Sequence, residues 1–317
     1  MKKILIGLGL FIITVKVLDI TGFYFLSYFY DHTFVGQDGG DINKYLQDKN
    51  PPEMIIMGSS TTRFQVNPDS FPVRSCNLSR AMTTDCYQLG LLSLMIQENK
   101  IPETILLSLW PRNYLQVGKK DNRPEDVLFL RYYYNRSDYI KKEINNISYF
   151  ESYKFLLSSY RFNGMVTNTL KYYYLGRKQT DTGYYFKYQQ SNANDSINIT
   201  SALNMRIKNV TTKSLPLSTF NTAYLARFID TCKKYHINLV CYYMPMLDED
   251  ELLIKNGVDF MDGVVKEKNI PLLKFSRDNA GILFSNPGYW VDGEHMNEKG
   301  GAVQSSMLAA FVKEHFK

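Results

Sequence analysis

Two short stretches of the chain carry residue types that can share one hydrolytic reaction. The first is Gly-Tyr-Trp-Val-Asp-Gly-Glu-His-Met-Asn-Glu-Lys-Gly-Gly, residues 288–301, which holds His295, one of 4 histidines. Asp292 lies three residues before it, so a carboxylate and an imidazole of one loop can converge on a common point. An imidazole oriented in this way is the general base of a hydrolytic triad, which also needs a serine from elsewhere in the chain.

The second stretch is Gly58-Ser59-Ser60, directly after the apolar run 54–57. A glycine permits a sharp turn at the end of a strand. A hydroxyl just beyond that turn lies at a helix N-terminus, where backbone N–H groups can stabilise an oxyanion. Because a serine alone is a poor nucleophile, we expect His295 to act as its base and Asp292 to orient the imidazole. By itself, Gly-Ser-Ser also fits an ordinary strand-to-helix cap.

Short apolar runs alternate with helical patterns around these stretches. This alternation predicts a parallel sheet covered by helices on both faces. Catalytic residues of such sheets gather beyond the carboxyl ends of the strands, where both stretches would lie. The expected strands are 54–57, 75–78, 104–110, 237–243 and 271–275, and the expected helices are 85–97, 222–235, 252–268 and 302–316.

These two stretches resemble motifs of the SGNH/GDSL hydrolase superfamily. The first motif there is Gly-Asp-Ser or Gly-x-Ser after the first strand, and its nucleophile, two places after the glycine, falls on Ser60. The last motif is Asp-x-x-His, matched by Asp292 and His295. The resemblance covers residues 53–115 and 220–317. Flanking residues are similar to the membrane-anchored branch, which includes proteins that help to acylate alginate and teichoic acid: Tyr289, Asn297 and Gly300 or Gly301.

The resemblance implies an α/β fold, a three-layer flavodoxin-like parallel sheet with helices on both faces, preceded by one N-terminal transmembrane helix. It also implies an exported, membrane-anchored serine esterase or O-acyltransferase. The substrates would be acyl esters, in particular acetyl esters, of cell-envelope or extracellular polysaccharide. The partners would be the acylated glycan or acyl donor and a membrane acyltransferase. The alternative is a non-catalytic envelope protein that keeps the fold and binds glycan or a partner.

Two motifs of the superfamily are incomplete in this chain. The second motif places a glycine N–H in the oxyanion hole after an asparagine. The stretch 77–81 has the asparagine but no glycine, which leaves the backbone N–H of Arg80 or Ala81 for this role. The third motif is Gly-x-Asn-Asp, of which Asn113 remains, either as an oxyanion donor or as a turn residue. Losing one such donor costs about 100- to 1,000-fold in rate, so a slow, transfer-specialised or degenerate enzyme also fits.

Composition argues against several other classes of protein. The net charge of +6 is spread over 317 residues without an arginine-rich stripe, which disfavours nucleic-acid binding. No P-loop, His-Glu-x-x-His or glycine-rich dinucleotide motif is present, so neither a cofactor nor a metal is implied. The 4 cysteines show no Cys-x-x-Cys and no zinc spacing, and we expect buried thiols, with a disulfide between the first two left open: Cys76, Cys86, Cys232 and Cys241.

Residues 1–30 predict a membrane anchor. Lys2 and Lys3 precede a mostly apolar run that is interrupted by Lys16 and Asp19, which share a helix face and can pair. A membrane span needs about 20 apolar residues. The alternative is a cleaved signal peptide with the apolar region 4–15, although no small-x-small cleavage site follows. The basic end would stay cytoplasmic and the remainder would be exported.

The remaining segments complete the expected organisation. Residues 31–52 are polar and end in two prolines, which predicts a tether before an α/β domain at 53–317. Residues 116–215 are rich in Tyr, Asn, Lys and Ser and predict an inserted cap, with helices near 125–134 and 149–160. Other candidates are weaker. The tyrosine runs 132–134 and 172–174 either stack on sugar rings or pack internally, and Arg63 either meets an anionic sugar or is a solvated helix residue.

Overall fold

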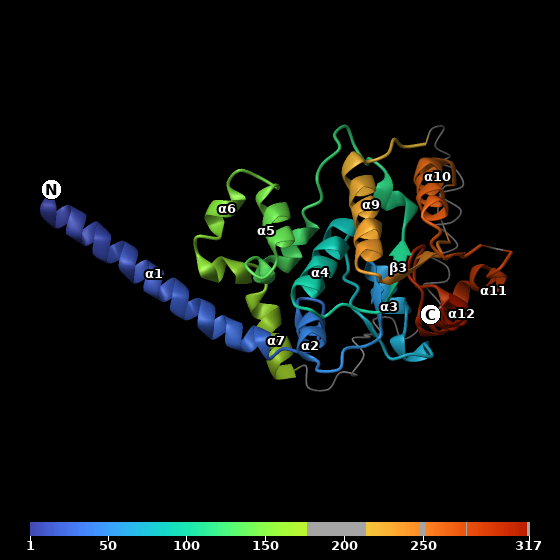
Figure 1. Cartoon of the computed structure of the whole chain (residues 1–317), viewed down its shortest axis with the longest axis horizontal. Helices are drawn as coiled ribbons and strands as arrows, with labels where there is room; N and C mark the ends of the chain where they lie inside the picture. The colour runs from blue at the N-terminus through green and yellow to red at the C-terminus, as the bar shows by residue number, and fades with distance from the viewer. Residues whose placement is uncertain (176–213, 248–250, 277, 316–317) are drawn as a thin grey trace.

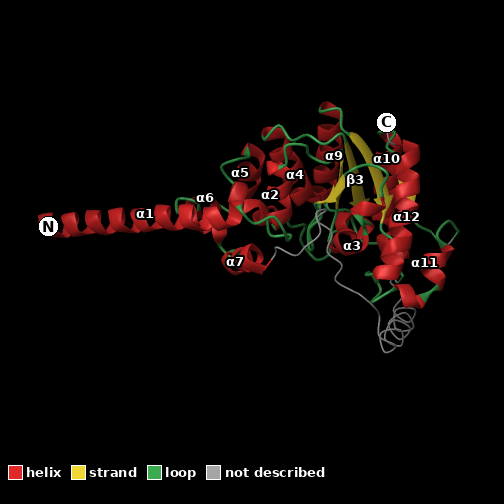
Figure 2. Ribbon diagram, turned by 90° about the horizontal axis from the view of Figure 1, so that it is seen from below, coloured by secondary structure: helices red, strands yellow, loops and turns green. Residues whose placement is uncertain are grey.

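One parallel sheet lies at the centre of the body of the molecule (Figures 1 and 2). The computed structural model describes residues 1–175, 214–247, 251–276 and 278–315. The five strands follow the order β2-β1-β3-β4-β5, and each neighbouring pair is parallel. The expected α/β fold with a parallel sheet is therefore confirmed. The strands are β1 (Met54–Met57), β2 (Ser75–Asn77), β3 (Thr104–Leu109), β4 (Asn238–Tyr243) and β5 (Leu272–Lys274).

Helices cover both faces of the sheet, so the strands are apolar on both sides. Ile55 and Met57 of β1 belong to one apolar cluster, and Met54 and Ile56 belong to the other. The first face is covered by α4 (Asp85–Gln97), α9 (Thr219–Lys234) and α10 (Glu251–Glu267). The second face is covered by α3 (Ser60–Gln65), α11 (Gly281–Ser285) and α12 (Glu298–His315). Short 3₁₀ turns η1 (Pro68–Ser70), η2 (Pro111–Tyr114) and η6 (Pro287–Tyr289) lie in the connections.

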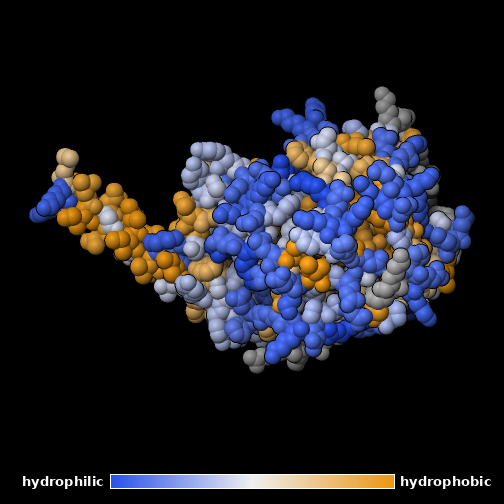
Figure 3. Space-filling model, in the orientation of Figure 1, coloured by the Kyte–Doolittle hydropathy of each residue, from blue (hydrophilic) through white to orange (hydrophobic). Residues whose placement is uncertain are grey.

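The N-terminal helix α1 (Lys2–Asp31) projects from the body as a long arm (Figures 1 and 2). By length and composition it can cross a membrane, and apolar side chains coat the arm (Figure 3). The expected pairing of Lys16 with Asp19 is confirmed, since their Nζ and Oδ2 atoms lie 3.0 Å apart. The far end of α1 joins the body, where Tyr30 is buried against Tyr132 and Phe162.

Residues 31–52 are a folded segment, unlike the expected tether. Helix α2 (Gly40–Gln47) presents Ile42, Tyr45 and Leu46 to the apolar cluster that contains Ile55 and Met57. Its polar residues also face inward, because the Asn43 side-chain amide donates to the Tyr30 carbonyl at 2.6 Å. The polar composition suggests a solvated linker because the sequence does not show that these polar groups are buried. Their hydrogen-bond partners lie elsewhere in the chain.

The described part of the expected cap packs beside the sheet domain. Its elements are η3 (Asp126–Tyr133), α5 (Asp138–Asn145), α6 (Glu151–Lys154), η4 (Ser158–Phe162) and α7 (Val166–Leu175). A Cβ on Gly90 of α4 would meet Leu130 Cδ1 at 2.8 Å, so η3 lies directly on α4. Tyr132, Tyr133 and Tyr134 are buried, which supports packing over sugar stacking for this run. The rest of the expected cap, 176–213, lies outside the described residues.

Candidate active site

Ser60 is placed by a tight turn at the end of β1. Gly58 follows the strand, and a Cβ there would meet Thr62 Oγ1 at 2.3 Å and Ser108 Cβ at 2.8 Å, so only glycine fits without displacement. Ser60 is the first residue of α3. The buried Asn77 of β2 holds the helix, since its side-chain amide donates to the carbonyls of Thr62 at 2.9 Å and Val66 at 3.0 Å.

The loop that carries His295 is a narrow hairpin with a buried anchor. Trp290 is fully buried and its indole N–H donates to the Leu283 carbonyl at 2.7 Å. The hairpin closes through the N–H of Val291, which donates to the His295 carbonyl at 2.8 Å. Asn297 fixes the base of the loop, since its side chain donates to the Gly288 carbonyl at 2.6 Å. The loop therefore holds His295 in a defined position before α12 begins.

Ser60, His295 and Asp292 form one hydrogen-bonded row. The Oγ of Ser60 lies 3.1 Å from His295 Nε2. The other ring nitrogen, Nδ1, lies 2.9 Å from Asp292 Oδ2 and 3.1 Å from Oδ1. An ionised carboxylate only accepts hydrogen bonds, so Nδ1–H donates to Asp292 and Nε2 is left to accept the Ser60 proton. The structure thus brings together the three residues that the sequence predicts as nucleophile, base and orienting acid.

The Asp292 carboxylate is held in its ionised form. Burial opposes ionisation, but hydrogen bonds from the His295 ring and from backbone N–H groups hold the pKa of Asp292 below its ordinary 3.8. The two N–H donors are those of Glu294 at 2.8 Å and His295 at 2.7 Å. A carboxylate that accepts three donors within one loop favours a fixed imidazole orientation. This arrangement suits stabilisation of an imidazolium when Nε2 takes a proton.

Helices α3 and α12 are fastened to each other next to the row. A Cβ on Gly301 would meet the Gln65 carbonyl at 2.8 Å, which only a close helix approach produces. The Ser305 hydroxyl lies 3.1 Å from that same carbonyl and 2.7 Å from the Gly301 carbonyl, so its proton is shared between them. Gln65 Nε2 donates to the Glu294 carbonyl at 3.2 Å. Sequence reasoning missed Gln65 and Ser305 as positioning residues. The glycine pair 300–301 was the available signal, because adjacent glycines early in a helix indicate a close approach.

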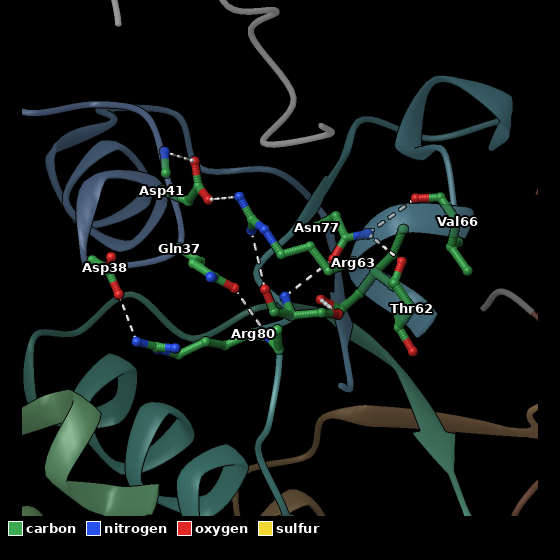
Figure 4. A network of polar contacts seen from close by, with 12 residues as sticks. Gln37, Asp38, Asp41, Thr62, Arg63, Val66, Asn77 and Arg80 are labelled. Atoms are coloured by element: carbon green, nitrogen blue, oxygen red, sulfur yellow. Dashed lines mark hydrogen bonds and ion pairs between the residues drawn. The ribbon is translucent and has the colours of Figure 1, made fainter. Parts of the chain in front are cut away.

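The three predicted oxyanion donors do not join this row. The N–H of Arg80 donates to the Gly58 carbonyl at 3.1 Å, and the N–H of Ala81 donates to Gln37 Oε1 at 3.0 Å. Figure 4 shows Gln37 and Arg80 side by side, with the Arg80 guanidinium paired to Asp38 at 2.5 Å. Both N–H groups therefore already have acceptors in the folded chain. The expectation that Arg80 or Ala81 offers a free N–H to an oxyanion is wrong for this conformation.

Asn113 is held by its backbone in η2, which follows β3. Its N–H donates to the Trp110 carbonyl at 2.9 Å, and its carbonyl accepts from Asn221 Nδ2 at 2.6 Å. Within the described residues, its side chain makes no hydrogen bond with Ser60 or His295. Asn113 lies at the same edge of the sheet as Ser60 because β1 and β3 are parallel neighbours.

Arg63 is a structural residue of α3 and not a solvated one. Its guanidinium lies 2.7 Å from Asp41 Oδ2, and both side chains are buried. It also donates to the Ser79 carbonyl at 3.0 Å. Figure 4 shows this bridge from α3 to α2. Both sequence interpretations of Arg63, contact with an anionic sugar and a solvated face, are therefore wrong.

The cysteines have no part in the site. Cys76, Cys86, Cys232 and Cys241 are free and buried, as expected, so the open disulfide between the first two is not formed. Burial raises the pKa of the Cys232 thiol to about 12, which keeps it protonated and unreactive. Among the described residues, no three His, Cys, Asp or Glu side chains gather as they would around a metal ion.

No protein-family model matches this sequence, and no curated protein matches it. Because a fold alone does not imply a function, the function has to be argued from the geometry of the site.

Proposed function

We propose that this chain is a membrane-anchored serine hydrolase or O-acyltransferase of the SGNH/GDSL type. Its substrates would be acyl esters, in particular acetyl esters, of cell-envelope or extracellular polysaccharide. The observation that carries the proposal is the 3.1 Å contact between Ser60 Oγ and His295 Nε2, with Asp292 bonded to the opposite ring nitrogen. A nucleophile bonded to a base that is itself oriented by a third group is the arrangement that activates a serine.

The reaction follows from these three side chains. Ser60 Oγ attacks the acyl carbonyl carbon while its proton passes to His295 Nε2, and Asp292 stabilises the imidazolium. The tetrahedral intermediate then expels the alcohol, which takes the proton from His295 and leaves the acyl group esterified to Ser60. In the second half, water or a sugar hydroxyl gives a proton to His295 and attacks the acyl-enzyme. Water yields a free acid, whereas a sugar yields a new ester.

The sheet topology supports this location for a reaction. The order β2-β1-β3-β4-β5 is that of the flavodoxin-like arrangement, in which ligands bind where the strand order reverses. That reversal lies between β1 and β3, and Ser60 follows β1 directly. We therefore propose a flavodoxin-like three-layer domain with its reactive serine at the reversal point.

The anchor supports an envelope location. Lys2 and Lys3 precede the apolar part of α1 and would stay on the cytoplasmic side, which puts the body on the exported side. Asp19 and Tyr30 of α1 are buried in contacts with the body. Since these contacts make the helix part of the folded structure, they favour a retained anchor over a cleaved signal peptide. A membrane acyltransferase would be a suitable acyl donor for a body held at the bilayer.

A non-catalytic role has one observation in its favour. The N–H groups of Arg80 and Ala81 are bonded to Gly58 and to Gln37, so neither is available to an oxyanion in this conformation. The N–H of Ala81 becomes available only if the Gln37 side chain moves aside. In the alternative, the chain keeps the fold and binds glycan or a membrane acyltransferase without chemistry.

Labelling with a fluorophosphonate separates these two functions. The reagent phosphonylates a base-activated serine with loss of fluoride, so the full chain in detergent should label and Ser60→Ala should not. Ser59→Ala is the matched control, because the Ser59 hydroxyl contacts Thr61 Oγ1 at 3.2 Å and not His295. This control should label as the wild type does. A folded wild type that neither labels nor hydrolyses p-nitrophenyl acetate would support the binding role.

A further inference from the structure

Helix α1 is attached to the body well before its C-terminal end. The Asp19 carboxylate accepts from the N–H of Ser158 at 2.9 Å, and from the N–H and hydroxyl of Ser159 at 2.8 and 2.7 Å. Lys16 Nζ donates to the Leu156 carbonyl at 2.7 Å and pairs with Asp19. These contacts satisfy both charged groups and fix α1 to the start of η4.

The free part of α1 is too short to cross a bilayer alone. It covers residues 2–15, which is about 21 Å at a rise of about 1.5 Å per residue. The hydrocarbon core of a bilayer is about 30 Å thick, and a span needs about 20 residues. A span that begins at Ile4 therefore extends to about Phe23, past the attachment at Lys16 and Asp19. The surface beside this attachment has to enter the membrane with the helix.

That surface is apolar and aromatic. Tyr149 is 75% exposed, Phe150 67% and Leu156 69%, and Tyr153 and Leu157 are exposed beside them. We call residues 149–157, which include α6, the 149–157 patch. Figures 1 and 2 both show α6 on the side of the body from which α1 emerges. Aromatic side chains with a polar tip favour the membrane interface, and a cluster of exposed apolar residues marks an interaction surface.

We infer that the 149–157 patch is a second membrane contact, which rests in the headgroup and upper acyl region of the lipid bilayer next to α1. The occupant is lipid because the patch continues the exposed apolar surface of α1 at the depth that the span requires. The inference rests on the proposal that α1 crosses the membrane. Two contacts on one body, a span and an interfacial patch, fix the tilt and height of the domain above the bilayer. The active site is therefore held at a set distance from the bilayer surface.

Site-specific fluorescence tests the patch in the full chain. Because the natural cysteines are buried, the exposed variants Tyr153→Cys, Leu10→Cys and Ile282→Cys each offer one accessible thiol for an NBD dye. The labelled chains are placed in vesicles of phosphatidylcholine and phosphatidylglycerol, with and without doxyl-labelled lipid. Leu10 reports on the span, and Ile282 lies in α11 at the opposite end of the body (Figures 1 and 2).

The expected result is a blue-shifted emission and strong quenching at 153 and at 10, with quenching at 153 about twofold or more above that at 282. In the background Phe150→Ser and Leu156→Ser, quenching at 153 should fall while that at 10 persists. Quenching at 10 without quenching at 153 overturns the patch. Equal quenching at 153 and 282 also overturns it, since it shows unspecific adsorption.

Failure of the span is distinguished in the same experiment. If residue 10 is not quenched, α1 does not cross the bilayer and the patch falls with it. Fluorophosphonate labelling of Ser60 is measured on the same samples, and it tests the proposed chemistry independently of the membrane. Labelling equal to that of the wild type, with an unchanged circular dichroism spectrum, also verifies that each cysteine and serine variant is folded.

Discussion

The Ser60 hydroxyl lies 3.1 Å from Nε2 of His295, although 235 positions separate the two residues in the chain. Two independent anchors produce this contact. Asn77 of β2 fixes the helix that starts with Ser60, and the buried Trp290 fixes the loop of His295. The close packing of α3 on α12 then joins the two parts. The geometry is therefore set by the fold and not by a flexible approach of two loops.

Replacement of Asp292 by asparagine should separate orientation from charge. The new side-chain amide would keep the loop hydrogen bonds from Glu294 and His295 through its oxygen, but it would no longer hold Nδ1 as a donor. We expect the hydrolysis rate of p-nitrophenyl acetate to fall about 100- to 10,000-fold, with the fold intact. The measurement is kcat and KM for p-nitrophenyl acetate in the wild type and in Asp292→Asn.

Glu294→Gln is the control for Asp292→Asn, because it removes the same charge from the same loop. Its kcat should stay within about twofold of the wild type, since only the backbone of Glu294 contacts Asp292 and Gln65. A loss in Glu294→Gln as large as that in Asp292→Asn would point to loop charge as the cause and contradict the orienting role of Asp292.

Gly58→Ala tests the tight turn that presents Ser60. The new methyl group would overlap Thr62 Oγ1 and Ser108 Cβ, so the turn has to shift. We expect a loss of about 1–3 kcal/mol in the free energy of unfolding. If Ser60 is the nucleophile, as proposed, a displacement of its Oγ by about 1 Å should also lower kcat roughly 100-fold. Thermal unfolding followed by circular dichroism and kinetics on the same samples measure both effects.

Gly263→Ala provides the matched comparison. This glycine lies inside α10, and nothing stands within 4 Å of the added Cβ. Alanine is favoured over glycine in a helix by about 1 kcal/mol, so this variant should be as stable as the wild type or more so. If both variants behaved alike, the space around Gly58 would not limit the turn.

The sequence predicted the elements that bury a continuous apolar run or a periodic apolar pattern. Residues 54–57 and 85–97 were expected with the bounds observed for β1 and α4, because each is an uninterrupted apolar or periodic pattern. Ser60, Asp292 and His295 were expected in one place because the ends of parallel strands share an edge of the sheet. Their catalytic roles stay predictions until they are tested by the variants above.

The rest depended on pairings between distant residues. Helix α2 was missed because its polar Asp41 and Asn43 are buried against Arg63 and Tyr30, which no local pattern reveals. For the same reason, the sequence offered no sign that Gln37 occupies the N–H of Ala81, 44 positions away. Such long-range polar contacts are decided by tertiary packing and not by propensity.

Arg63→Met tests the buried bridge between α2 and α3, the helix that begins with Ser60. Burial raises the pKa of Asp41 above its ordinary value, and the charge of Arg63 opposes that rise. Without Arg63, the carboxyl is left buried and unpaired, and we expect a loss of about 3–5 kcal/mol in the free energy of unfolding. The double variant Arg63→Met with Asp41→Leu should recover part of the loss, as measured by thermal or urea unfolding in detergent.

The exposed pair of Arg74 and Asp48 serves as the control for the variants of Arg63 and Asp41. Their atoms lie 4.0 Å apart, and Arg74 also makes exposed hydrogen bonds to the carbonyls of Asn50 and Pro51, so Arg74→Met should cost only about 1 kcal/mol. Equal losses in Arg63→Met and Arg74→Met would show that the Arg63 bridge has no special weight. If the double variant recovered no stability, the loss would come from the missing packing of the Arg63 side chain and not from the unpaired Asp41 carboxyl.

Asp85 at the start of α4 should make the stability depend on pH. Burial raises the pKa of this carboxyl from 3.8 to about 7; a hydrogen bond from Tyr114 lowers it, and the charge of Asp126 raises it further. Between about pH 4 and 7 the folded state therefore keeps a proton that the unfolded state releases. Stability should fall as the pH rises through this window and level off above it.

Asp85→Asn removes this linkage at the same size and shape. The variant should be more stable than the wild type at pH 8, with an upper limit of about 4 kcal/mol from the size of the shift. The difference should shrink toward zero as the pH falls below about 4, where both states of the wild type hold the proton. Burial also raises the pKa of Asp126 to about 6, so the stability of the variant should still fall with pH, with a smaller slope.

Thermal midpoints at pH 4.5, 6 and 8 measure the trend, with Asp69→Asn at an exposed position as the charge-matched control. A gain that is equal at every pH would show that Asp85 is ionised in the folded protein, and that the substitution acts through packing or helix capping instead.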